Sequence, residues 1–121
     1  MSSSSTVIKY YPMVTYSSTF ITSSYTQMGT PYEYGILGYK IFNDTTQDIL
    51  ISVDGVNDQD YISPSHHAYY LQLASANLKS SPFIQLPPGT VFFVKCPVPT
   101  IGNVYVTAFY AYDAPKTLPG L

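Results

Sequence analysis

Short strand-like runs, separated by turn-forming residues at roughly ten-residue intervals, constrain the fold of this chain more than any other feature. The run at residues 49–53 places apolar residues at every second position and ends at Asp54-Gly55, a strong turn signal. The run at residues 90–95 follows the turn Pro87-Pro88-Gly89 and is rich in β-branched and aromatic residues. Runs of this kind predict an all-β chain that folds as a β-sandwich or jelly-roll-like antiparallel domain.

Three more strands are expected from the same signals. Residues 39–42 are mostly apolar or aromatic and precede a turn-forming cluster at residues 43–46. Residues 104–111 alternate, so every second side chain from Val104 to Ala108 is expected to face inward. Residues 67–73 fit a strand, although their apolar spacing also permits a short helix.

The chain is expected to form one domain, because two halves of 121 residues would each be too small to bury a good core. Residues 38–112 carry the regular strand signals and are assigned to the sandwich. Residues 1–37 contain two charges, Lys9 and Glu33, and their alternation is broken. This predicts either an extended N-terminal arm or outer strands of the same domain. Residues 113–121 include two prolines and a glycine and are expected to form a C-terminal tail outside the sheet.

The charge content argues against nucleic-acid and membrane partners. Charged residues make up 10% of the chain, against about a quarter in typical domains, and all five cations are lysine. A phosphate-binding face needs clustered cations, preferably arginine. No run approaches about 18 apolar residues, and the N-terminus lacks the basic and apolar regions of a signal peptide. A single cysteine, Cys96, excludes an internal disulfide.

An acidic loop is the first candidate for a chemical site. Five of the seven acidic residues fall within residues 44–60, and residues 54–60 read DGVNDQD. Counted from Asp54, the third, sixth and twelfth positions lack the acid, glycine and glutamate of an EF-hand loop. We therefore interpret Asp54 and Gly55 as structural turn residues, with a calcium site of another geometry as the alternative.

Histidine, cysteine and glycine patterns do not predict catalysis. Adjacent side chains on a strand point to opposite faces, so His66 and His67 cannot readily bind one metal ion. Cys96 shares a predicted strand face with Phe92 and Val94, which is typical of a buried, unreactive thiol. The sequence contains neither a phosphate-binding loop nor a G-x-S-x-G motif. We therefore expect no enzymatic activity, no cofactor and no metal site.

Tyrosine is the remaining signal. The chain has 13 tyrosines and no tryptophan, and tyrosine provides large amphipathic contact area in protein interfaces. Strands also favour tyrosine for packing reasons alone, but the aromatic residues of the first 37 positions are unusually crowded. The candidate interface residues are Tyr10, Tyr11, Tyr16, Phe20, Tyr25, Tyr32 and Tyr34. Pro88 and Gly89 join Asp54 and Gly55 as candidate structural turns.

The order of motifs over residues 35–111 resembles small virion proteins of tailed bacteriophages. The motifs are KIFNDT at residues 40–45, ISVDGVND at residues 51–58, FIQLPPGTVFFVK at residues 83–95 and GNVYVTAFY at residues 102–110. The last two are similar to the "lPxGTxfyVK" and "GxVYvxxxYg" segments of such proteins. The resemblance implies a particle component at the head surface, neck or tail, and it implies no catalysis.

From this resemblance we expect a non-enzymatic virion structural protein that docks on and stabilises the capsid or the head–tail assembly, with head decoration preferred. The expected partners are the major capsid protein or other virion subunits, and the protein is expected as a homo-oligomer or in many copies per particle. Its expected locations are the virion and, during assembly, the host cytoplasm.

Two alternatives from other functional classes remain. One is a carbohydrate- or receptor-binding β-sandwich module of a phage tail or fibre, since tyrosine also stacks on sugar rings. The other is a small jelly-roll hydrolase, for which the sequence offers no recognisable acid–base pair.

Overall fold

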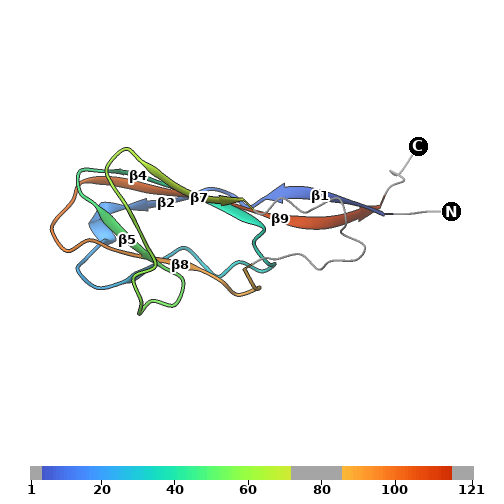
Figure 1. Ribbon diagram of the computed structural model, residues 1–121, viewed down its shortest axis with the longest axis horizontal. Helices are drawn as coiled ribbons and strands as arrows, with labels where there is room; N and C mark the ends of the chain where they lie inside the picture. Colours follow the sequence, from blue (N-terminus) through green and yellow to red (C-terminus); the bar gives the residue numbers. More distant parts are fainter. Residues whose placement is uncertain (1–3, 72–85, 116–121) are drawn as a thin grey trace.

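The chain forms two antiparallel β-sheets that face each other (Figure 1). A computed structural model describes residues 4–71 and 86–115, and these residues contain nine strands and one short 3-10 helix. Every pair of neighbouring strands is antiparallel, which confirms the predicted all-β, antiparallel fold. No helix in these two ranges is long and apolar enough to cross a membrane.

The first sheet is built around its longest strand, β9 (Gly102–Pro115). β4 (Gly38–Thr45) pairs with one side of β9, and β7 (His67–Leu71) adds to the outside of β4. β1 (Ser4–Tyr10) and β2 (Val14–Ser17) pair one after the other along the opposite side of β9. β7 resolves the choice between strand and helix in favour of a strand as far as Leu71, and residues 72–73 lie outside the described residues.

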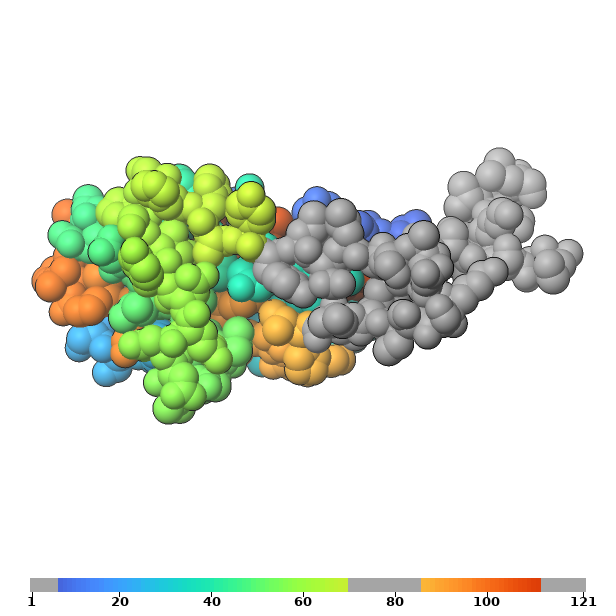
Figure 2. Space-filling model, viewed as in Figure 1, coloured from blue at the N-terminus to red at the C-terminus, as the bar shows by residue number. Residues whose placement is uncertain are grey.

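The second sheet has the order β3 (Thr26–Met28), β8 (Phe92–Lys95), β5 (Ile49–Ser52) and β6 (Asp60–Ile62). The 3-10 helix η1 (Ser18–Phe20) follows β2, where the chain leaves the first sheet for the second. The chain returns to the first sheet between β6 and β7, and this green segment crosses the face turned to the viewer in Figures 1 and 2.

The hydrophobic core fills the space between the two sheets. β4 and β9 contribute buried aliphatic side chains from the first sheet, and β5, β6 and β8 contribute them from the second. These side chains are Ile41, Val104, Val106, Ala108, Ile49, Ile51, Ile62 and Val94. The inward face predicted for residues 104–108 is therefore confirmed. Burying one branched aliphatic side chain contributes about 1.5–3 kcal/mol, so this layer is the main source of stability.

β4 is longer than the sequence predicts. The turn signal at residues 43–46 is overridden, because β4 continues to Thr45. Asn43 is fully buried, and its Nδ2 donates hydrogen bonds to the backbone oxygens of Gln47 and Ile62, both at 2.8 Å. Its Oδ1 accepts from the backbone N–H of Thr45 at 3.0 Å. Since these bonds satisfy the whole amide, a residue typical of turns is accommodated in a buried strand.

The first 37 residues contribute to both sheets. β1 and β2 pair with β9, and β3 pairs with β8. Met28, Tyr32 and Ile36 are buried in the shared core. The sequence left open whether this segment is an extended arm or a set of outer strands of the same domain. For residues 14–37 the structure has outer strands. Within the described part of this segment, β1 is the strand that reaches beyond the sandwich.

β1 and the C-terminal part of β9 form a two-stranded ribbon that leaves the sandwich at one end (Figure 1). β4 stops pairing opposite Phe109, whereas the β1 register continues to Pro115. The predicted boundary between sheet and tail at residue 113 is therefore wrong. Residues 113–115 belong to β9, because the β1 backbone provides their ladder partners. Residues 116–121 lie outside the described residues.

Candidate protein interface

Three of the seven candidate interface residues present large exposed surfaces. Tyr10, on the ribbon, is 67% exposed and lies beside Phe109, with ring centroids 5.3 Å apart. Phe20, at the end of η1, is also exposed and contacts the ring of Tyr16 at 5.9 Å. Tyr34 is half-exposed. These side chains remain candidates for contact with a partner.

Tyr32 is the clearest correction to the predicted interface. Its side chain is 7% exposed and belongs to the core, so almost no surface remains for a partner. The ring packs between Tyr11 at 4.6 Å and Phe92 at 6.3 Å. Burial raises the pKa of the Tyr32 hydroxyl, and it is the main cause of that shift.

Tyr11 is a structural residue at the junction between β1 and β2. Its hydroxyl donates to the backbone oxygen of Tyr34 at 3.0 Å and accepts from the backbone N–H of the same residue at 2.9 Å. Tyr110 packs against both rings, at 4.7 Å from Tyr11 and 5.0 Å from Tyr34. Burial raises the pKa of Tyr11, although the backbone hydrogen bond opposes the shift. This cluster ties the base of the ribbon to the segment that precedes β4.

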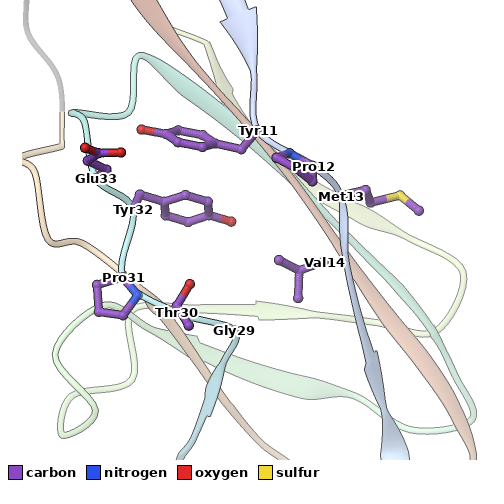
Figure 3. A pocket seen from close by; sticks show the side chains of 9 residues that line it. All are labelled: Tyr11, Pro12, Met13, Val14, Gly29, Thr30, Pro31, Tyr32 and Glu33. Atoms are coloured by element: carbon purple, nitrogen blue, oxygen red, sulfur yellow. The ribbon is translucent and has the colours of Figure 1, made fainter.

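A groove of about 530 Å³ lies beside Tyr11 (Figure 3). One wall is the β1–β2 junction, residues 11–14, and the facing wall is the loop at residues 29–33. Apolar side chains dominate its lining, and Glu33 is the one carboxylate among the nine lining residues. The groove therefore offers apolar contact area and lacks the paired acid and base that hydrolytic catalysis needs.

The outer face of the first sheet carries a second group of aromatic side chains, on β4, β7 and β9. The strand register places Phe42 between Tyr105 of β9 and His67 of β7, with centroid distances of 6.4 Å and 4.5 Å. Tyr69, two residues further along β7, is 74% exposed. We call Phe42, Tyr105, His67 and Tyr69 the aromatic face. Its charged neighbours are Lys40, opposite Tyr69 in the register, and the exposed Asp44, two residues from Phe42 on the same side of β4.

The sequence contained part of the signal for the aromatic face. Alternation along residues 104–111 places Tyr105 outward, and alternation along residues 67–73 places His67 and Tyr69 on one side. The missing information was strand order, because only the pairing of β4 with both β7 and β9 brings Phe42 between the other rings. The predicted interface, limited to the first 37 residues, therefore missed this surface.

Asp54 organises the acidic loop through its hydrogen bonds. The Asp54 carboxylate accepts from the backbone N–H groups of Val56 and Asn57, both at 2.8 Å, and from the Ser52 hydroxyl at 2.7 Å. These bonds, led by those from the Asn57 and Val56 backbones, lower the pKa of Asp54 strongly. Gly55 has a φ of 74°, the left-handed conformation that favours glycine at this turn.

Asp58 connects the same loop to the second sheet. Its Oδ1 accepts from the Tyr25 hydroxyl at 2.7 Å and lies 3.0 Å from the Lys95 Nζ, and Nζ lies 4.6 Å above the Tyr25 ring. The hydrogen bond from Tyr25, and then the one from Lys95, lower the pKa of Asp58. Burial, and then the bond to Asp58, raise the pKa of Tyr25. Tyr25 therefore has a binding partner within the chain.

Cys96 and His66 each contact a backbone oxygen of the same chain. Cys96 is buried, and its Sγ–H donates to the backbone oxygen of Asp48 at 3.3 Å. His66 Nδ1 lies 2.8 Å from the backbone oxygen of Pro64. Within the two described ranges, no three His, Cys, Asp or Glu side chains are grouped so that they could hold a metal ion. Gly89, in the other predicted turn, has a φ of 89°.

Comparisons with known proteins show a distant structural likeness. No protein-family model and no curated protein matches the chain. Among solved structures, the chain is similar to the SPP1 Dit (gp 19.1) protein, described as a paradigm of the hub adsorption apparatus in phages that infect Gram-positive bacteria. The two are 13% identical with a TM-score of 0.37, over 87% of this chain and 49% of that chain. The chain thus spans about half the length of this structure.

Proposed function

We propose that this chain is a non-enzymatic structural subunit of a tailed-bacteriophage particle. The motif resemblance over residues 35–111 supports the class of particle. The aromatic face is the observation that carries the binding role, because the rings of Tyr105, Phe42 and His67 lie side by side on the outside of the first sheet, with the exposed Tyr69 two residues along β7. Rigid aromatic side chains provide large contact area at low entropy cost, as in many protein interfaces.

The partner in this proposal is an apolar, weakly charged patch on a larger virion subunit, such as the major capsid protein. The aromatic face offers ring surfaces with one neighbouring cation, Lys40, and one neighbouring carboxylate, Asp44, so ion pairs contribute little to recognition. Aromatic pairs contribute about 0.5–1.5 kcal/mol each beyond the area they bury. Symmetry repeats such a contact over many copies, so a modest single contact suffices. We propose the head surface as the position.

The test compares two exposed tyrosines on opposite sheets. Tyr69 lies on the aromatic face, whereas Tyr61, 62% exposed on β6, belongs to the second sheet and serves as the control. Particles assembled with Tyr69→Ser should retain at least tenfold fewer copies after purification than particles with Tyr61→Ser. Quantitative mass spectrometry of separated heads and tails measures the copy number and the position.

Two results would contradict the proposal. The first is absence of the wild-type chain from purified particles. The second is saturable binding of a saccharide that Tyr69→Ser abolishes and Tyr61→Ser preserves, which would favour the carbohydrate-binding module. Recovery on tails and not on heads would reject the head position alone.

A further inference from the structure

The outer edge of β1 is available for pairing as far as the described residues show. β1 pairs with β9 on one side, and no other described strand pairs with it. The backbone N–H of Tyr11 donates to Ala108 of β9 at 2.9 Å. Because backbone groups alternate in direction along an antiparallel strand, Lys9 and Val7 also direct theirs to β9. Ile8 and Tyr10 therefore direct their N–H and C=O groups to the outside.

This edge lacks the features that limit pairing at the edges formed by β2, β3 and β6. The outer strands of the second sheet, β3 and β6, are three residues long, and short edges resist unwanted pairing. Pro12, which cannot donate a backbone hydrogen bond, lies two residues before β2. β1 has seven residues, no proline and a single charged residue, Lys9. It is thus a template for another strand.

The ribbon also needs a third strand for physical reasons. Beyond Phe109 the described sheet consists of β1 and β9 alone, and a two-stranded ribbon is marginally stable in water. Ile8 and Tyr10, 48% and 67% exposed, place apolar surface on this ribbon. An added strand would cover part of that surface and satisfy the outward backbone groups.

We propose that β1 pairs antiparallel with β1 of a second copy of this chain, around a two-fold axis at Val7. This register aligns all seven residues of both strands. It places Lys9 opposite Ser5 of the partner strand, so no like charges face each other. β1 carries one charged residue, so it offers no charge pattern that would select an unrelated strand. Pairing with an identical strand does not require such a pattern. A two-fold contact is also closed, so it ends at a dimer.

The register makes a sharp geometric prediction. Val7 faces Val7 of the second copy in a pair without direct hydrogen bonds, where Cα atoms are about 4.5 Å apart. That spacing lies inside the range of about 4.4–6.8 Å that a disulfide needs. Ile8 is opposite Thr6 of the second copy, so two Ile8 residues are diagonal neighbours at about 7–8 Å. The proposal does not depend on the proposed virion role.

The first experiment uses cysteine cross-linking of the purified full chain. Val7→Cys should form an intermolecular disulfide under mild oxidation, at least tenfold faster than Ile8→Cys, its matched neighbour. The native Cys96 is buried and should not form intermolecular disulfides. The wild-type chain, treated in the same way, is the control for this. Absence of cross-linked dimer in Val7→Cys, or equal rates in the two variants, would overturn the proposed register.

The second experiment measures association without any new bond. Sedimentation should show a wild-type dimer whose Kd rises at least tenfold, about 1.4 kcal/mol, in Ile8→Pro and in Ile8→Lys. Proline at position 8 removes an outward N–H and leaves the ladder with β9 intact, and melting curves verify folding. Ile101→Lys, an exposed substitution in the loop before β9, should leave the dimer unchanged. A monomeric wild type, or a dimer that survives both Ile8 variants, would refute self-pairing.

Discussion

Asp54 shows how one carboxylate can hold a whole loop. Its oxygens accept hydrogen bonds from Ser52, Val56 and Asn57, and these bonds are stronger when the carboxyl group is ionised. The lowered pKa means that folding favours the carboxylate over its protonated form. The resulting stabilisation is therefore present above the ordinary aspartate pKa of about 4 and is lost as the pH falls from there toward the lowered value.

We predict that the melting temperature of the wild type falls as the pH decreases below about 4, and that Asp54→Asn flattens this fall. Asparagine keeps one acceptor oxygen but cannot bind an additional proton in this range. Asp44→Asn, an exposed substitution on β4, is the matched control. Calorimetry from about pH 2 to pH 7 measures the effect. The interpretation fails if Asp54→Asn and Asp44→Asn have the same acid sensitivity, or if a chelator lowers the melting temperature at neutral pH.

At the scale of single residues, sequence predicted local roles and missed distant ones. The turn at Asp54-Gly55 was predictable because its partners lie within three residues. The contacts of Asp58 with Tyr25 and Lys95 join residues more than thirty positions apart, which no local pattern reveals. Tyr32 was misassigned for the same reason, since its burial depends on Phe92, which is distant in the sequence.

At the scale of elements, β4 contains a fully buried polar side chain, Asn43. We predict that Asn43→Ala lowers the free energy of unfolding by about 2 kcal/mol or more, because the backbone oxygens of Gln47 and Ile62 lose their donor in the interior. Asn43→Asp should be worse at neutral pH, since it replaces that donor with a buried negative charge. Urea denaturation measures both changes.

The adjacent residue provides the control for this prediction. Asp44 is exposed on the same strand, so Asp44→Ala should change the unfolding free energy by no more than about 0.5 kcal/mol. Equal effects of Asn43→Ala and Asp44→Ala would show that the Asn43 network adds nothing to stability.

At the scale of elements, the existence of strands was predictable and their ends were not. Alternation in residues 49–53 and 104–108 located β5 and β9, because a half-buried strand imposes that pattern directly. The ends of β4 and β9 lie where turn-forming or proline-containing sequence pairs with a neighbouring strand. Whether such residues turn or continue depends on that partner, which the local sequence does not specify.

The whole molecule has its N-terminal strands built into the sheets of the same chain. We predict that in the purified protein the amides of residues 14–17 and 26–28 exchange with solvent slowly, as those of β4 and β9 do, since they pair with β9 and β8. Hydrogen-exchange mass spectrometry measures this. Fast exchange in the free protein that slows only in an assembled particle would instead support an arm that orders on its partner.

β9 has one further consequence, for the order in which the chain can fold during translation. β9 pairs with β1, β2 and β4 of the first sheet and follows all three in the sequence. Ser4 can therefore pair with Pro115 only after Pro115 has been synthesised. Until then β1, β2 and β4 lack the strand that joins them, and their apolar residues are not buried in a complete sheet. β1 and β2 are synthesised first and therefore leave the ribosome before β9, their pairing strand, exists. The sandwich forms in a late, long-range step that is slow compared with local folding.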